Sequence, residues 1–107
     1  MNHEIQFLLY NSPEGGENVQ VLVKDETIWM TQKAISQLFD CTVDNVGLHL
    51  RNIFMEGELS EISTTEKFSV VQKAGKRNVN RELTFYNLDA IISVGSRVNS
   101  ITATNFS

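Results

Sequence analysis

Two short helical patterns separated by a tight break constrain the fold of this chain more than any other feature of its sequence. The patterns lie within Thr31–Phe54, and the break falls at Asp40 and Cys41. Because so short a turn gives the chain little room to reverse, the helices are expected to cross steeply rather than lie antiparallel. This arrangement is typical of the helix-turn-helix of DNA-binding proteins.

The first helix is predicted from a capping residue and an apolar face. Thr31 precedes the pattern and is expected to cap it through its hydroxyl. Gln32 and Lys33 are expected to stay solvated, and Ser36 is small where the helices should approach most closely. The positions that helical spacing gathers on one buried face are Ala34, Ile35, Leu38 and Phe39.

The second helix is predicted at about residues 42–54 and is the candidate recognition helix. Thr42 is its expected N-cap. Gly47 lies in its interior, where glycine costs about 1 kcal/mol relative to alanine. We expect it to mark a close helix approach rather than a ligand site. The predicted buried stripe contains Val43, Val46, Leu50, Ile53 and Phe54.

The face opposite this stripe determines whether the helix can recognise DNA bases. Asparagine pairs with adenine, arginine pairs with guanine or a phosphate, and an exposed leucine contacts the methyl group of thymine. Two interpretations stay open: base recognition, or an ordinary solvated face whose Leu48 packs on a neighbouring segment. The residues of this face are Asp44, Asn45, Leu48, Arg51 and Asn52, with His49 at the edge.

The distribution of charge is more informative than its total. The net charge of −4 argues by itself against a nucleic-acid partner. However, residues 67–81 contain five basic residues and no acidic residue, whereas residues 1–30 and 55–66 are strongly acidic. A single segment therefore holds the basic charge that contact with phosphates requires.

This basic segment lies in a predicted β-hairpin at residues 67–86. Strands are expected at Phe68–Gln72 and Glu82–Tyr86, joined by the polar link KAGKRNVNR. A hairpin with cations at its tip, following a recognition helix, is typical of the wing of a winged helix. The alternative is that the lysines protect a sheet edge against aggregation. The candidate phosphate contacts are Lys73, Lys76 and Arg77.

An N-terminal β-hairpin is predicted from the patterned segments Glu4–Tyr10 and Val19–Val23. The segment between them, NSPEGGEN, is expected to form its turn. Ile28 and Trp29 are expected to lead into the first helix cap. Trp29 is expected to be buried with its indole N–H paired, and the alternative is a surface ring that stacks on a base.

Residues 55–66 are predicted to end the recognition helix, turn near Gly57 and link to the hairpin, with Leu59 and Ile62 facing inward. The glutamates of this segment are expected to form a solvated face rather than a catalytic site. No partner base or apolar pocket is apparent around them in the sequence.

The last predicted helix follows Asn87, its expected cap. Its wide apolar arc must pack on the core or on a second copy of the chain, so a homodimer through residues 88–98 is expected. Residues 101–107 are expected to fray. The apolar positions are Leu88, Ile91, Ile92, Val94 and Val98, and the outward positions are Ser93, Ser96 and Arg97.

Composition and motifs exclude several classes of protein. Cys41 stands alone and is expected to be a small buried hydrophobe, and with only His3 and His49 beside it no zinc set can be assembled. No apolar run spans a bilayer and no signal peptide is apparent, so the chain is expected in the cytoplasm. No Walker loop, GxSxG, HExxH or GxGxxG motif occurs, and we expect neither an enzyme nor a cofactor or metal.

Three stretches share a longer pattern: ETIWMTQKAISQLFDCTVDNVGLHLRNIFMEGEL, the basic hairpin, and YNLDAIISVGSRVNS. Together they resemble the N-terminal region of the RhuM family of bacterial virulence-associated proteins. The resemblance implies DNA binding by a winged-helix-like N-terminal domain, followed by a longer, mostly helical C-terminal part. After Asn99 and Ser100 the family continues with basic residues and a further helix, whereas ITATNFS follows here. The chain is therefore expected to be part of a longer family architecture.

These patterns predict an α+β fold: a winged helix-turn-helix with an N-terminal β-hairpin and a C-terminal helix, in a single domain over residues 1–107. The expected function is sequence-specific binding of double-stranded DNA in a transcriptional regulator. The alternative is a protein-interaction module of a virulence-associated protein that recognises no DNA base. The candidate DNA-binding residues are Gln32, Lys33, Thr42, Asn45, Leu48, His49, Arg51, Asn52, Lys73, Lys76 and Arg77.

Overall fold

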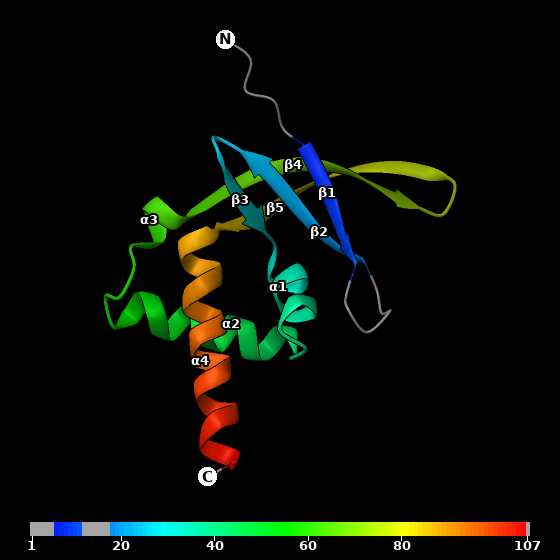
Figure 1. The fold of residues 1–107 in the computed structure, drawn as a ribbon. Coiled ribbons are helices and arrows are strands. Elements are labelled where there is room, and N and C mark those ends of the chain that lie inside the picture. The colour runs from blue at the N-terminus through cyan, green and yellow to red at the C-terminus, as the bar shows by residue number, and fades with distance from the viewer. Residues whose placement is uncertain (1–5, 12–17, 107) are drawn as a thin grey trace.

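The fold is α+β, as predicted, with an antiparallel sheet and helices gathered against one of its faces (Figure 1). The computed structural model describes residues 6–11 and 18–106, and within them the side chains of all but 6–11, 18, 72–74 and 100–106. In chain order the elements are β1 (Gln6–Asn11), β2 (Asn18–Lys24), β3 (Thr27–Met30), α1 (Gln32–Leu38), α2 (Val43–Met55), α3 (Glu61–Thr64), β4 (Thr65–Ala74), β5 (Arg77–Asn87) and α4 (Leu88–Phe106). Among the described helices, none is both long and apolar enough to cross a bilayer.

The strands follow the order β1-β2-β3-β5-β4, and every neighbouring pair is antiparallel. β1 and β2 form the predicted N-terminal hairpin, while the turn expected at residues 12–17 lies outside the described residues. Ile28 and Trp29 lead into the helix cap as predicted, and they do so as part of β3, a strand that the sequence analysis did not predict and that ends one residue before Thr31. Asp25 and Glu26 have φ values of 54° and 62°, and this tight turn returns the chain beside β2.

The two faces of the sheet hold different apolar clusters, because side chains alternate along each strand. Met30 and Tyr86 belong to the cluster on the helical side, and their neighbours Trp29 and Phe85 to the cluster on the other side. Trp29 is 8 % exposed and its indole N–H donates to the backbone oxygen of Lys24 at 3.3 Å. The predicted burial and pairing are confirmed, and a buried indole is not available to stack on a base.

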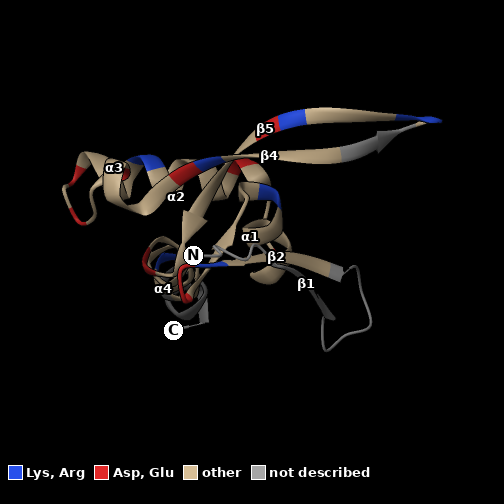
Figure 2. Ribbon diagram, turned by 90° about the horizontal axis from the view of Figure 1, so that it is seen from above, with Lys and Arg blue, Asp and Glu red and all other residues tan. Residues whose placement is uncertain are grey.

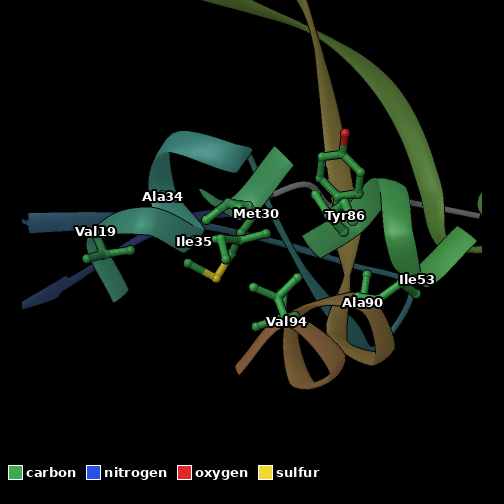
Figure 3. Packing of buried hydrophobic residues seen from close by; sticks show 11 residues of the cluster. Val19, Met30, Ala34, Ile35, Ile53, Tyr86, Ala90 and Val94 are labelled. Atoms are coloured by element: carbon green, nitrogen blue, oxygen red, sulfur yellow. The ribbon is translucent and has the colours of Figure 1, made fainter. Parts of the chain in front are cut away.

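The main core lies between the helices and the sheet (Figure 3). Ile35 of α1, Ile53 of α2 and Val94 of α4 are fully buried, in one cluster with Met30 and Tyr86. Burying one such aliphatic side chain contributes about 1.5–3 kcal/mol. Packing on shared residues fixes the positions of the three helices on the sheet, and hence the surfaces that they expose.

Several apolar positions predicted to face inward are exposed. Leu59 packs on the core as predicted, but Ile62 in the same segment is 92 % exposed. Cys41 is half-buried rather than buried, and its desolvation raises the pKa of the thiol. The exposed positions lie where no neighbouring element covers the edge of an apolar arc. Besides Ile62, the exposed residues that were predicted to face inward are Leu38, Val43, Leu88 and Ile92.

The close helix approach expected at Gly47 occurs at Gly95 instead. A Cβ at Gly95 would lie 2.6 Å from the ring of Phe39, so the absence of a side chain allows α4 to pass close to the end of α1. A Cβ at Gly47 would meet only Oε1 of Gln32, at an ordinary 3.5 Å. Ser36, predicted to lie where α1 and α2 approach, is buried.

The C-terminal helix begins as predicted but continues further. Asn87 caps α4, since its Oδ1 accepts from the N–H of Ala90 at 3.2 Å. The prediction that residues 101–107 fray is wrong for the backbone as far as Phe106, which remains helical. Ser93 and Arg97 were predicted to face out, but both form hydrogen bonds with the loop that follows α2.

Candidate nucleic-acid interface

Capping hydrogen bonds fix where α1 and α2 begin. Thr31 Oγ1 accepts from the N–H of Ala34 at 3.1 Å. Thr42 Oγ1 accepts from the N–H of Asn45, also at 3.1 Å, so both predicted caps are confirmed. Between the helices Asp40 has a φ of 54°, the left-handed conformation that commonly follows a helix end. A cap of this kind contributes about 1 kcal/mol, which helps to fix where α2 begins.

The outer face of α2 exposes the predicted base-contacting side chains to different extents. Asn45 and Arg51 are exposed, whereas His49 and Asn52 are half-buried at the flanks of this face. Leu48 keeps 50 % of its surface exposed, so it does not pack away on a neighbouring segment as the alternative interpretation requires. Also exposed in this region are Lys33 and Thr42.

An open hollow of about 670 Å³ lies on this surface, lined by residues of α1, α2, α3 and β5. Gln32 lines the hollow. It was predicted to stay solvated, but its side-chain Nε2 donates a hydrogen bond to the hydroxyl of Tyr86 at 3.0 Å. Tyr86 itself is anchored in the core. The bond therefore links the start of α1 to β5 and orients the carboxamide at the wall of the hollow.

Acidic side chains limit what this hollow can bind. Asp44 and Glu61 line it together with Arg51. Carboxylates repel phosphate oxygens, so phosphate contact is not favoured here. The uncharged edges of bases meet weaker repulsion, because their acceptor atoms carry only partial charges.

β4 and β5 form a long hairpin whose outer part extends away from the helices (Figure 2). The strands pair residue for residue as far as Ala74 opposite Arg77, which leaves only Gly75 and Lys76 for the turn. Most of the link KAGKRNVNR is therefore strand rather than the predicted turn-forming loop. The hairpin and α2 lie along the same side of the molecule, and α4 lies on the opposite side (Figure 2).

The strand register divides the basic residues of the hairpin between its two faces. Directly paired residues share a face, and successive residues alternate. Lys67 pairs with Thr84 and lies on the helical side of the sheet. Arg81 pairs with Val70 and lies on the side of the Trp29 cluster.

The three predicted phosphate contacts do not form one cluster. Lys76 is exposed in the turn, and Arg77 is exposed beside it on the same face as Arg81. Lys73 pairs with Asn78 in the backbone register, but its side chain lies outside the described part of the chain. Positive charge is thus displayed at the tip of the hairpin and on both of its faces.

An aromatic cluster fixes the base of the hairpin. The ring of Phe68 lies edge-on to those of Trp29 and Phe85, with centroids 5.9 Å and 5.3 Å away. The Lys24 ammonium lies 4.8 Å from the Phe68 centroid. It also forms an ion pair with Glu66, and the hydrogen bond within this pair raises the pKa of Lys24. The prediction that Glu66 is merely solvated is wrong, because strands distant in sequence supply its partner.

A second set of polar contacts, which we name the Arg97 clasp, joins α4 to the loop after α2. The Nη2 of Arg97 donates to Oε1 of Glu56 and to Oε1 of Glu58, both at 2.7 Å. The hydroxyl of Ser93 also donates to Glu58. The bonds from Ser93 and then Arg97 lower the pKa of Glu58. Glu56 and Glu58, predicted to be a solvated face, are therefore structural partners of α4.

The β4–β5 hairpin and α4 lie in the part of the chain that matches a known family. Residues 63–107 match the Virulence protein RhuM family. The predicted resemblance is confirmed for these residues, which lie in the C-terminal part of the chain. α1 and α2 lie outside the RhuM match. No curated protein and no solved structure matches the chain.

Three features of this region could not be found from the sequence pattern. Lys67 lies on the helical side of the sheet because of the strand register, and the sequence pattern predicted the ends of these strands only approximately. The Arg97 clasp joins residues 39 and 41 positions apart, and no local pattern signals such a pair. The bond between Gln32 and Tyr86, 54 positions apart, was missed for the same reason.

Proposed function

We propose that this chain is a winged-helix module that binds double-stranded DNA with sequence preference, as part of a transcriptional regulator. In this proposal α2 enters the major groove, and the β4–β5 hairpin is the wing that lies along the phosphate backbone. The observation that supports it best is that α2, which exposes Asn45, Leu48 and Arg51, lies along the same side of the molecule as the basic hairpin (Figure 2).

The division of chemistry between the two elements also supports the proposal. Phosphate contacts supply affinity, and base contacts supply sequence preference. The wing segment has five basic residues and no acid, whereas α2 exposes Asn45, Leu48 and Arg51, which suit base edges. An acidic total charge is compatible with this function because the basic charge is concentrated in one element.

Assembly and location complete the proposal. Two half-sites one helical turn apart require two recognition helices, so the module acts as a dimer through α4. Its site of action is the cytoplasm, where bacterial DNA is accessible.

A binding assay on pooled random duplexes tests this function. Fluorescence anisotropy at about 50 mM and 200 mM salt should show binding that weakens steeply with salt, and selection from the pool should enrich a common motif. Binding without enrichment would remove sequence preference. Absence of binding at both salt concentrations would overturn the proposal.

A protein-interaction module is the second candidate function, and one observation favours it. Leu48, Met55 and Ile62 are at least half exposed, and exposed apolar groups are typical of protein-binding surfaces. This candidate predicts that Met55→Ser leaves DNA affinity unchanged while abolishing capture of a protein partner. The DNA assay above separates the two functions directly.

A further inference from the structure

The hollow beside α2 combines an oriented carboxamide with exposed apolar side chains. Gln32, Gly47, Leu48 and Tyr86 all line it, together with Val43 at the start of α2. Gly47 has no side chain, and a Cβ there would contact Oε1 of Gln32 at 3.5 Å. No side chain of α2 therefore fills the space directly beside the Gln32 carboxamide at this position.

The Gln32 side chain keeps the groups that an adenine edge requires. An amide has two N–H donors and one acceptor oxygen. One donor is used by the hydroxyl of Tyr86 at 3.0 Å. The second N–H and Oε1 remain, and these match N7 and the N6 amino group of adenine. The bond to Tyr86 restricts the rotamer of Gln32, which lowers the entropy lost on binding.

The apolar lining matches the other half of the same base pair. Thymine presents a methyl group in the major groove, which apolar side chains contact. Val43 and Leu48 are 42 % and 50 % exposed, so they keep apolar surface that a methyl group can cover. Arg51 lies one helical turn beyond Gly47 and Leu48 and thus meets a different base pair or a phosphate.

The acidic lining selects against the alternative base pair. Guanine presents two acceptors, O6 and N7, in the major groove. Adenine shares the N7 acceptor but presents its N6 amino donor where guanine presents O6. The carboxylates of Asp44 and Glu61, which line the hollow, therefore disfavour the guanine O6 and not the adenine N6 amino group.

We propose that this hollow recognises an A·T base pair, with Gln32 contacting adenine, Leu48 and Val43 contacting the thymine methyl group, and Tyr86 acting as the positioning residue for Gln32. This inference rests on the proposed DNA binding and names the base pair that the site prefers. The hydroxyl of Tyr86 acts through Gln32 and does not itself touch the base.

Base analogues test the assignment on the duplex that selection enriches. Deoxyuridine removes only the thymine methyl group, and 7-deazaadenine removes only the N7 acceptor. A matched base pair of this kind is worth about 5- to 150-fold in discrimination. At one A·T pair both analogues should weaken binding by the wild-type chain severalfold, as measured by anisotropy. Insensitivity to both analogues at every A·T pair would overturn the inference.

Three variants assign the effects to side chains. Gln32→Met keeps the length but lacks the amide, and should lose the response to 7-deazaadenine. Leu48→Ala should lose the response to deoxyuridine but keep the response to 7-deazaadenine. Tyr86→Phe keeps the buried ring and should weaken only the 7-deazaadenine response. Gln20→Met makes the same substitution at an exposed glutamine of β2 that does not line the hollow, and as the control it should retain both responses.

The outcomes distinguish this inference from the proposed function. If no sequence is enriched, both fail. If a sequence is enriched but Gln32→Met and Leu48→Ala respond to the analogues like the wild type, only the assignment of the hollow fails. Thermal melting of each variant checks folding, and Gln32→Met decides the role of the carboxamide should Tyr86→Phe unfold.

Discussion

Asn45, Leu48 and Arg51 project from α2 into solvent, although the same helix buries Val46 and Leu50 in the core. One helix thus has a buried face and an exposed face, so its packing and the proposed DNA contact can be tested separately. Substitution on the outer face should change DNA binding without changing the free energy of unfolding. Surface positions of this kind usually alter stability by less than about 0.5 kcal/mol.

We predict that Asn45→Ala and Arg51→Ala each weaken specific binding by about 1–3 kcal/mol while leaving non-specific binding nearly unchanged. Anisotropy on the selected duplex and on a scrambled duplex measures the difference. An equal loss on both duplexes would assign these side chains to phosphate contact. No loss on either would remove this face of α2 from the interface.

The two helical glycines provide a matched pair of stability predictions. Gly95→Ala places a Cβ 2.6 Å from the Phe39 ring, and overpacking of this kind costs about 1–3 kcal/mol. That cost exceeds the gain of about 1 kcal/mol from alanine in a helix. At Gly47 the new Cβ meets only an ordinary contact, so Gly47→Ala should stabilise the chain. Urea denaturation compares the two variants, and stabilisation by Gly95→Ala would contradict the packing.

At the scale of elements, the β4–β5 hairpin and the Arg97 clasp both depend on pairing between distant residues. Uninterrupted pairing and the Phe68 cluster fix the direction of the hairpin relative to the sheet. The clasp fixes α4 to the loop after α2 through Glu56 and Glu58. Each element therefore has a predicted response that follows from its own contacts.

For the hairpin, replacing Lys73, Lys76 and Arg77 together by Ala should flatten the slope of log affinity against log salt by about three units, because each phosphate contact adds about 0.9. The effect should be equal on every DNA sequence, and folding should hardly change. Titrations at several salt concentrations measure the slope. An unchanged slope together with stronger light scattering would favour protection of the sheet edge instead.

The register supplies a control within the same hairpin. Lys67→Ala removes a charge from the side of the sheet that faces α2, and should reduce the slope by about one unit. Arg81→Ala removes a charge from the other face and should reduce it less. Equal effects would show that the facing of the hairpin does not matter for phosphate contact.

For the clasp, stability should depend on the ionisation of Glu58. Its pKa is lowered in the folded chain, so its contribution is present above the ordinary glutamate pKa and is lost as pH falls through the lowered value. Glu58→Gln should therefore lower the melting temperature at pH 7, and the difference from wild type should shrink toward pH 3. Glu61→Gln, at an exposed position of α3, is the control. A constant difference across this pH range would remove the electrostatic explanation.

At the scale of the whole molecule, most of the α4 arc is already used by the core. Ile91 and Val94 are buried, and Val98 packs against the core, whereas Leu88 and Ile92 remain exposed. The apolar surface left for a partner is therefore smaller than the sequence arc implies. Any dimer through this surface should be weak.

We predict a concentration-dependent dimer through residues 88–98. Ile92→Lys should abolish it without unfolding the chain, because Ile92 is 58 % exposed. Sedimentation equilibrium across a wide concentration range measures the association. A monomer mass that is independent of concentration would contradict the dimer but leave DNA binding by a single copy open to the binding assay.

Local chemistry made the helix pair and its caps predictable from sequence. Thr31, Thr42 and Asn87 cap helices because a hydroxyl or amide oxygen reaches a free N–H within one turn. The alternation of Leu83 and Phe85 with Thr84 and Tyr86 likewise predicted β5. The candidate residues on the outer face of α2 followed from the same periodicity, since the buried stripe defines the opposite side.

Tertiary structure alone determined the contacts between segments distant in sequence. β3 forms because strands on both sides supply its hydrogen-bond partners, although its four residues show little pattern. The Arg97 clasp, the Gln32–Tyr86 bond and the passage of α4 at Gly95 all join elements that no local rule relates. Periodicity indicates which side of an element is buried, but the partner that covers it depends on how the whole chain packs.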